Sequence, residues 1–149
     1  MEMKKILWPT DFSPNSQAAL PYVMSLGEQY QTEVHVLYVI PELGLHEPWY
    51  GEFDKTHIEK IHEWEEKKAK ERLDEICDKY LDGCPLFVKH IAKGDPAEEI
   101  LKTMEKENVD MVVMASRGRK GHFNFGSVAE AVLKYSTRPV VTIPIKKDG

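Results

Sequence analysis

Short apolar runs alternate with longer amphipathic stretches along the chain, and this alternation limits the fold more than any other feature. Ile6 to Trp8, Val34 to Ile40, Leu86 to Ile91, Val109 to Ala115 and Pro139 to Ile145 read as buried strands. Residues with a helical period fill the intervals between them. This order predicts an α/β fold, an open five-stranded parallel sheet with right-handed crossovers and helices on both faces.

Capping signals indicate where the helices begin. Ser13 is a good N-cap with Pro14 in the first helical position, and the periodic residues continue to Tyr30, with Pro21 expected to kink or distort the helix. The longest helical pattern runs from about Thr56 to Leu81.

Two later helices have capping-box signals. Asp95 precedes Pro96 and has Glu98 three residues on, which predicts a helix from that point. Ser127 and Glu130 have the same spacing and predict a last helix that ends near Tyr135.

Strand composition also predicts positions in the sheet, and one long loop stands out. The run from Val109 to Ala115 is the most apolar and should lie centrally. Prolines at both ends of the run from Pro139 to Ile145 favour an edge, because proline cannot donate a ladder hydrogen bond. From Pro41 to about Asp54 there is no period, which predicts an irregular excursion.

Length and charge exclude several classes of protein. The 149 residues predict a single domain over residues 1–149, and the net charge of −5 without a basic patch argues against nucleic acid as a partner. Cys77 and Cys84 are too few for a disulfide framework, which favours a reducing compartment. Because we find neither a signal peptide nor the roughly 20 apolar residues that span a bilayer, we expect a cytoplasmic protein without a membrane partner.

Ligands of an open α/β sheet bind beyond the carboxyl ends of the strands, where the strand order reverses. Pro9, Thr10 and Asp11 follow the first strand, and the Asp11 carboxylate can accept a hydrogen bond from a ribose hydroxyl or a base amine. The alternative for Asp11 is a solvent-exposed carboxylate that only stabilises the turn. The position after the first strand favours a ligand contact.

The segment after the fourth strand has the composition of an anion site. From Ala115 to Ser127 it carries three glycines and the cations Arg117, Arg119 and Lys120, and it leads into a helix N-terminus. The alternative is that Gly118, Gly121 and Gly126 only form turns and Ser127 only caps the helix. The order strand, loop and helix favours a bound phosphate.

Patterns of other enzyme classes are missing. No GxGxxG follows the first strand and no GxxxxGK[ST] occurs, which disfavours dehydrogenases and P-loop enzymes. The six histidines are scattered, His57 and His62 are five residues apart rather than four, and we expect them to be solvated. Ser116 lacks the GxSxG setting of a nucleophile. No residue is a convincing general base, so we expect at most very slow hydrolysis of a bound ligand.

Three local patterns carry a resemblance to the universal stress protein family. They are Lys5 to Ser13, Gly94 to Ile100, and Met114 to Gly118 with Gly126 to Glu130 and Arg138-Pro139-Val140. The resemblance covers the whole chain and implies a Rossmann-like fold similar to the adenine nucleotide alpha hydrolases. It also implies binding of ATP, ADP or AMP and a role in the stress response.

The resemblance implies a nucleotide site by motif position. Asp11 and the backbone near Val39 would hold adenine and ribose, and Ala115 and Gly118 would lie along the sugar and phosphates. Gly126, Ser127 and Val128 would receive the phosphate tail. The full set is Pro9, Thr10, Asp11, Val39, Met114, Ala115, Arg117, Gly118, Gly126, Ser127 and Val128.

The sequence departs from the ATP-binding pattern of that family, which is GxxG, nine residues, then G with Ser or Thr. Ala115 stands at the first glycine, and seven residues separate Gly118 from Gly126. Two hypotheses follow: an adenine nucleotide-binding protein with Mg²⁺ assisting, and a dimeric interaction protein of the same fold that does not bind ATP. An enzyme acting on a nucleotide-activated substrate is a third and weaker reading. Under the first two, the strand from Pro139 to Ile145 is expected to form a homodimer by pairing with its twofold mate.

Overall fold

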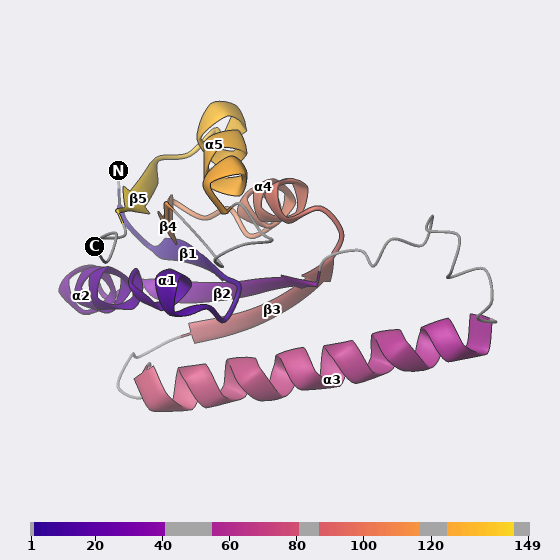
Figure 1. The fold of residues 1–149 in the computed structure, drawn as a ribbon. Coiled ribbons are helices and arrows are strands. Elements are labelled where there is room, and N and C mark those ends of the chain that lie inside the picture. The colour runs from indigo at the N-terminus through magenta and orange to yellow at the C-terminus, as the bar shows by residue number, and fades with distance from the viewer. Residues whose placement is uncertain (1, 41–54, 81–86, 117–124, 145–149) are drawn as a thin grey trace, which may run out of the picture.

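The computed structural model describes residues 2–40, 55–80, 87–116 and 125–144. Strands and helices alternate along these residues as Figure 1 shows, apart from a pair of consecutive helices after the first strand. The elements in chain order are β1 (Lys5–Thr10), α1 (Pro14–Gln17), α2 (Leu20–Tyr30), β2 (Glu33–Ile40), α3 (Lys55–Tyr80), β3 (Phe87–Lys93), α4 (Pro96–Lys106), β4 (Met111–Ala115), α5 (Phe125–Tyr135) and β5 (Val140–Ile143).

The strands form one five-stranded parallel sheet in the order β3-β2-β1-β4-β5. The predicted fold class is therefore confirmed. The strand β5 lies at an edge, as its prolines predict, and β4 lies in the interior of the sheet. The middle position belongs to β1, where Ile6, Leu7 and Trp8 are completely buried.

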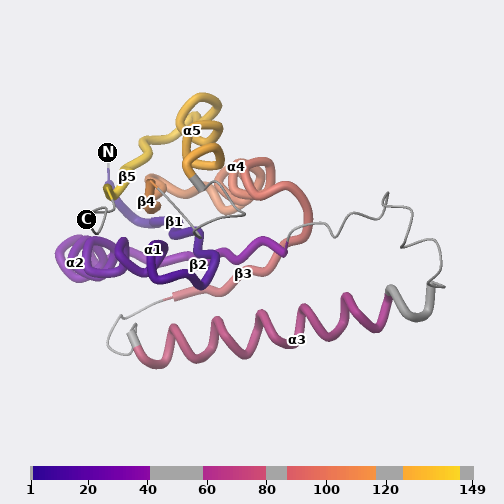
Figure 2. Tube along the Cα trace, viewed as in Figure 1, coloured from indigo at the N-terminus to yellow at the C-terminus, as the bar shows by residue number. Residues whose placement is uncertain are grey.

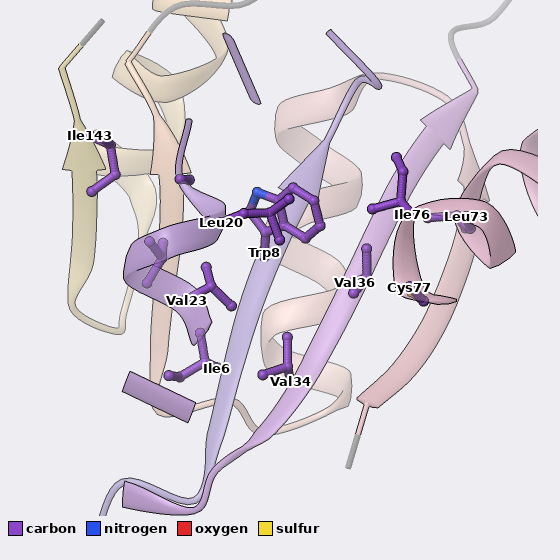
Figure 3. Close-up of a cluster of buried hydrophobic side chains, with 12 residues drawn as sticks. Ile6, Trp8, Leu20, Val23, Val34, Val36, Leu73, Ile76, Cys77 and Ile143 are labelled. Atoms are coloured by element: carbon purple, nitrogen blue, oxygen red, sulfur yellow. The ribbon is translucent and has the colours of Figure 1, made fainter. Parts of the chain in front are cut away.

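Helices cover both faces of the sheet (Figure 2). On one face α2 and α3 pack against β1 and β2, with α3 running alongside β2 and β3. The buried side chains between them form cluster one, and Figure 3 shows Trp8 at its centre beside Leu20 and near Val23 and Val36. Its members are Ile6, Trp8, Ala19, Leu20, Val23, Val34, Val36, Leu73, Ile76, Cys77, Val113 and Ile143.

The helices α4 and α5 cover the opposite face. The buried side chains beneath them form cluster two, which contains Leu7, Leu37, Val39, Ile100, Met104, Val109, Val112, Met114, Ala115, Val128, Ala129 and Val132. The start of α4 is as predicted, because the Asp95 side chain accepts from the Glu98 N–H at 3.0 Å and Pro96 occupies the first turn. Helices therefore cover both faces of the sheet, as is usual for a parallel sheet.

Two prolines act differently from the prediction. Pro21 does not merely kink one helix from Ser13 to Tyr30, because the helix is divided into α1 and α2 and Pro21 lies in the first turn of α2. A position in the first turn suits proline, because a backbone N–H there would have no intrahelical acceptor and its absence costs no hydrogen bond. Pro9 does not end the first strand but lies within β1, opposite Leu37 of β2.

Some boundaries also shift by a few residues. β3 ends at Lys93 rather than Ile91, and α5 begins at Phe125 rather than at Ser127. The loop from Pro41 to Asp54 lies outside the described residues. Among the helices that the structure describes, none has the length and apolar character needed to cross a membrane.

Candidate functional site

The strand order reverses between β1 and β4. From β1 the chain adds β2 and β3 on one side, and it then returns to add β4 and β5 on the other. Pairing of β1 with β4 joins Ile6 to Met111 and Leu7 to Val112. The Lys5 carbonyl accepts from the Asp110 N–H at 2.8 Å on the β4 side, and strand alternation puts the Pro9 nitrogen on that same side. Pro9 lies beyond the residues of β1 that pair with β4, so its lack of an N–H breaks no hydrogen bond between these strands. Ligands of such sheets bind at this end of the strands.

The turn after β1 is held in place by buried hydroxyl groups. The Thr10 and Ser16 hydroxyls lie 2.9 Å apart, and Thr10 Oγ1 also accepts from the Phe12 N–H at 3.1 Å. Phe12 has φ of 64°, a left-handed conformation that is uncommon for a residue with a side chain. Ser13 caps α1 by accepting from the Ser16 N–H at 3.1 Å. This network fixes the residue between Thr10 and Phe12, which is Asp11.

Asp11 uses only one of its carboxylate oxygens within the described chain. Its Oδ1 accepts from the Ser13 N–H at 2.9 Å and from the Ser13 hydroxyl. Its Oδ2 is buried and has no hydrogen-bond partner among the residues that the structure describes. A buried carboxylate oxygen without a donor is costly, so this atom is suited to a donor that a ligand brings.

Phe12 and Tyr38, the aromatic residues near Asp11, pack on the cluster-one face of the sheet. The Phe12 and Tyr38 ring centroids are 4.3 Å apart, and the Arg72 guanidinium lies 5.1 Å from the centre of the Phe12 ring. They line a pocket of about 270 Å³ together with Ile40, Trp64, Glu65, Lys68 and Ala69. None of the predicted nucleotide-site residues that the structure describes lines this pocket. Its contacts instead anchor the turn from the side of α3.

Four predicted site residues come together on the opposite face. Val39, Met114, Ala115 and Val128 all belong to cluster two. Met114 and Ala115 are fully buried, while Val39 and Val128 are 8% and 7% exposed. Their side chains are therefore core residues, and what they can offer a ligand is backbone at the ends of β2 and β4 and at the start of α5.

The start of α5 differs from the prediction in one respect. Because α5 begins at Phe125, Ser127 lies inside the first turn and is not the N-cap. With this start, Gly126 is the predicted site residue whose N–H lies in the first turn without an i−4 acceptor inside the helix, whereas the Val128 N–H lies further along the helix. Arg117 and Gly118, together with residues 119–121, lie outside the described residues.

Sequence reasoning missed a buried histidine. The expectation that the histidines are solvated is wrong for His35, which is 2% exposed and lies beside His90. The two residues are on neighbouring strands and 55 positions apart in the chain. No local motif links them, because only the pairing of β2 with β3 brings them together.

Fold and edge geometry together define a class of protein, the Rossmann-like α/β proteins with a nucleotide-binding architecture. Residues 2–144 match the model of the universal stress protein family, and the chain belongs to that family. Universal stress protein MJ0577 of Methanocaldococcus jannaschii is 34% identical to it, over 96% of each chain.

Solved structures agree with this assignment. A structure of MJ0577 superposes with a TM-score of 0.80 at 33% identity and covers 99% of this chain and 100% of that one. UspA from Lactobacillus plantarum reaches the same TM-score at 21% identity, with 96% and 99% coverage. Two more distant structures, described as complexes with cAMP and, for an Archaeoglobus fulgidus protein, with dAMP, have TM-scores of 0.61 and 0.65 at 14% and 19% identity, and each covers at least 95% of both chains. These last three likenesses show the shared fold.

Proposed function

We propose that this protein binds an adenine nucleotide at the carboxyl edge of the sheet, between the ends of β1 and β4, and acts in the stress response. The observation that carries the proposal is the buried Oδ2 of Asp11, which has no donor among the described residues. A ribose hydroxyl or the exocyclic amine of adenine supplies such a donor. An adenine nucleotide contains both groups.

The remaining parts of the nucleotide have matching surroundings. Adenine is flat and largely apolar, and the backbone beside Val39 and Ala115 borders cluster two. The first turn of α5, which contains Gly126, offers backbone N–H groups to a phosphate.

Relatives support the ligand class. Two proteins of this fold are described as complexes with cAMP and dAMP, and both ligands are adenine nucleotides. Which nucleotide this chain prefers among ATP, ADP and AMP depends on the phosphate end. A triphosphate carries more charge than the first turn of a helix neutralises, so we propose that Mg²⁺ assists the binding of ATP.

The test is calorimetry with AMP, ADP and ATP on the intact protein, with and without Mg²⁺, after a mass measurement of any nucleotide released on denaturation. In Gly126→Val a β-branched side chain enters the first turn of α5 and should abolish binding. Leu133→Val is the matched control, because Leu133 lies on the same helix and is 50% exposed. Unchanged affinity in Gly126→Val, with both variants folded by circular dichroism, would show that the phosphates bind elsewhere.

The second candidate function is a dimeric interaction protein that does not bind ATP. It is favoured by Ala115, whose methyl group stands at the first glycine of the family's ATP-binding pattern. If no nucleotide is released and none binds, this candidate replaces the first.

We also propose that the protein forms a homodimer through β5, as either function allows. The strand lies at the edge of the sheet, where unpaired backbone groups are available to a twofold mate. Val141 is half-buried within one chain and Pro144 is exposed just beyond the strand. Side-chain contacts from Val141 and its neighbours would then supplement a short backbone ladder.

A further inference from the structure

A cluster of two histidines and two glutamates lies on the cluster-two face of the sheet, between the amino end of β2 and the middle of β3. Glu33 and His35 alternate along β2 with Val34 and Val36, which belong to cluster one on the opposite face. His90 lies on β3 opposite Leu37. Glu107 follows the last residue of α4 as its C-cap. Because α4 runs antiparallel to the strands, its end reaches the edge of the sheet remote from Asp11. We call these four residues the histidine cluster.

The histidine rings face one another directly. His35 Nδ1 lies 2.8 Å from His90 Nε2, and His35 Nε2 lies 2.7 Å from Glu33 Oε1. The ring planes differ by only 10°. A ligand atom from each of His35, His90 and Glu107 lies within 4.8 Å of the other two. Three groups with lone pairs therefore converge on one small volume.

Glu33 determines the tautomer of His35. A carboxylate only accepts, so His35 Nε2 must carry the proton that Glu33 Oε1 accepts. In a neutral ring this leaves Nδ1 of His35 with a free lone pair, which accepts from His90 Nε2–H. A carboxylate behind a histidine that presents its other nitrogen forward is the arrangement found behind metal-binding histidines.

The surroundings favour neutral imidazole and a positive guest. His35 is 2% exposed. Burial, followed by the nearby His35, lowers the pKa of His90. Glu107 and the carbonyl end of α4 add negative charge, while Lys106 and the Lys5 ammonium, which donates to the Glu107 carbonyl at 3.1 Å, are the cations nearby.

From this geometry we propose that His35 Nδ1, His90 Nε2 and a Glu107 carboxylate oxygen bind one Zn²⁺ ion, with Glu33 as the group that orients His35. Two nitrogens and one carboxylate are a known ligand set for zinc, with bonds of about 2.0 to 2.2 Å and a water in the fourth position. Such bonds place two ligand nitrogens about 3.3 Å apart. The histidine nitrogens, now 2.8 Å apart, need to separate by roughly half an ångström, which side-chain rotation allows.

The proton balance is simple. In the metal-free protein the shared proton is on His90 Nε2. On binding, His90 presents that nitrogen to the ion and carries its proton on Nδ1 instead, by exchange with water. When both rings start as neutral imidazoles, no net proton is released, and the ion replaces the hydrogen bond between them.

The zinc ion would join β2, β3 and α4 at the end of the sheet opposite the proposed nucleotide site. It should stabilise the folded chain, since the ligands come together only in the fold. This inference does not rest on the proposed nucleotide function. Gly126→Val is accordingly expected to leave zinc binding unchanged.

The experiment is calorimetry with ZnCl₂ on the intact chain, prepared without a histidine tag, treated with EDTA and then freed of it. We expect one tight site per chain and a rise in Tm of about 5 to 10 °C at a hundredfold excess of zinc over its Kd. His90→Gln and Glu107→Gln should each remove the tight site. Glu33→Gln should weaken it about 10- to 100-fold, because it acts through His35.

His62→Gln is the matched control, since His62 lies on α3 across the sheet and should keep the tight site. Circular dichroism of each variant in EDTA shows whether it folds without the metal, and Co²⁺ bound in place of zinc reports the ligand set through its visible spectrum. Zinc binding by the intact chain that is no tighter than in a folded His90→Gln would overturn the proposal. The pair would then be a hydrogen bond between two histidines and nothing more.

Discussion

The hydroxyl groups of Thr10 and Ser16 lie 2.9 Å apart in the interior, and they join the end of β1 to α1. Ser16 is completely buried, its hydroxyl also donates to the Ser13 carbonyl at 2.9 Å, and its own carbonyl accepts from the Trp8 indole N–H at 3.2 Å. One small residue thus connects the centre of cluster one to the turn that holds Asp11.

Ser16→Ala should destabilise the protein by about 1 to 2 kcal/mol, because the Thr10 hydroxyl is left buried with one partner fewer. Urea unfolding measures the change. Ser25→Ala on α2 is the control, since Ser25 is exposed and the substitution should stay within about 0.5 kcal/mol. Equal losses in the two variants would contradict the role given to Ser16.

Asp11→Asn should weaken nucleotide binding about 10- to 100-fold if Oδ2 accepts from the ligand. The asparagine can keep one oxygen toward Ser13, but its amide group then presents a donor to a ligand donor. Calorimetry with AMP checks the affinity, and urea unfolding checks that the turn is intact. Glu99→Gln on α4, which also replaces one carboxylate by an amide, should leave the affinity unchanged. An Asp11→Asn protein that binds as tightly as the original chain would remove Asp11 from the site.

The Cys77 thiol should make the free energy of unfolding depend on pH. Burial raises the pKa of its thiol from 9.0 to about 11, partly opposed by Lys89. The folded state therefore keeps the proton that the unfolded state releases from pH 9 upward, so this contribution is complete below pH 9 and is lost between pH 9 and 11. The loss should reach about 2 kcal/mol.

Urea unfolding at pH 7, 9 and 10.5 tests the expectation for Cys77. The two proteins compared both carry Cys84→Ser, and one of them also carries Cys77→Ala. The alanine variant is less stable at pH 7 because it leaves a small cavity, and it should lose less stability on going to pH 10.5. A thiol reagent at pH 8 should label folded Cys77 slowly, because thiolate is about one part in a thousand there. Parallel pH curves for the two proteins, or fast labelling, would contradict the raised pKa.

If the protein dimerises through β5, a charged residue in that strand should change its oligomeric state. The intact protein should sediment as a dimer at micromolar concentration, and Val141→Lys should sediment as a folded monomer because a charge enters the pairing edge. Val141 also packs against cluster one, so Val141→Thr, which keeps the shape without the charge, separates a folding defect from an assembly defect. A monomeric intact protein would end this proposal.

Local signals were sufficient for much of the fold. The apolar runs and the capping residues Ser13 and Asp95 predicted the strands and the helix starts, because a strand's burial and a cap's hydrogen bond depend on neighbours in the chain. They placed the start of α5 two residues too late, since Ser127 has the spacing of a cap but is the third residue of a helix that begins at Phe125. Cap spacing cannot show where the preceding backbone has already turned helical.

The candidate sites also contain some features that local sequence determines and others that depend on tertiary contacts. The sequence alone determined the family resemblance, the position of Asp11 after the first strand and the approach of a glycine-bearing segment to the last helix, because each depends on a contiguous motif. Only the tertiary structure decided that Oδ2 of Asp11 is buried without a donor and that His35, His90 and Glu107 converge. Those residues meet through the parallel pairing of β2 with β3 and the packing of α4 on the sheet. Contacts between residues 55 positions apart leave no periodic trace in a single sequence.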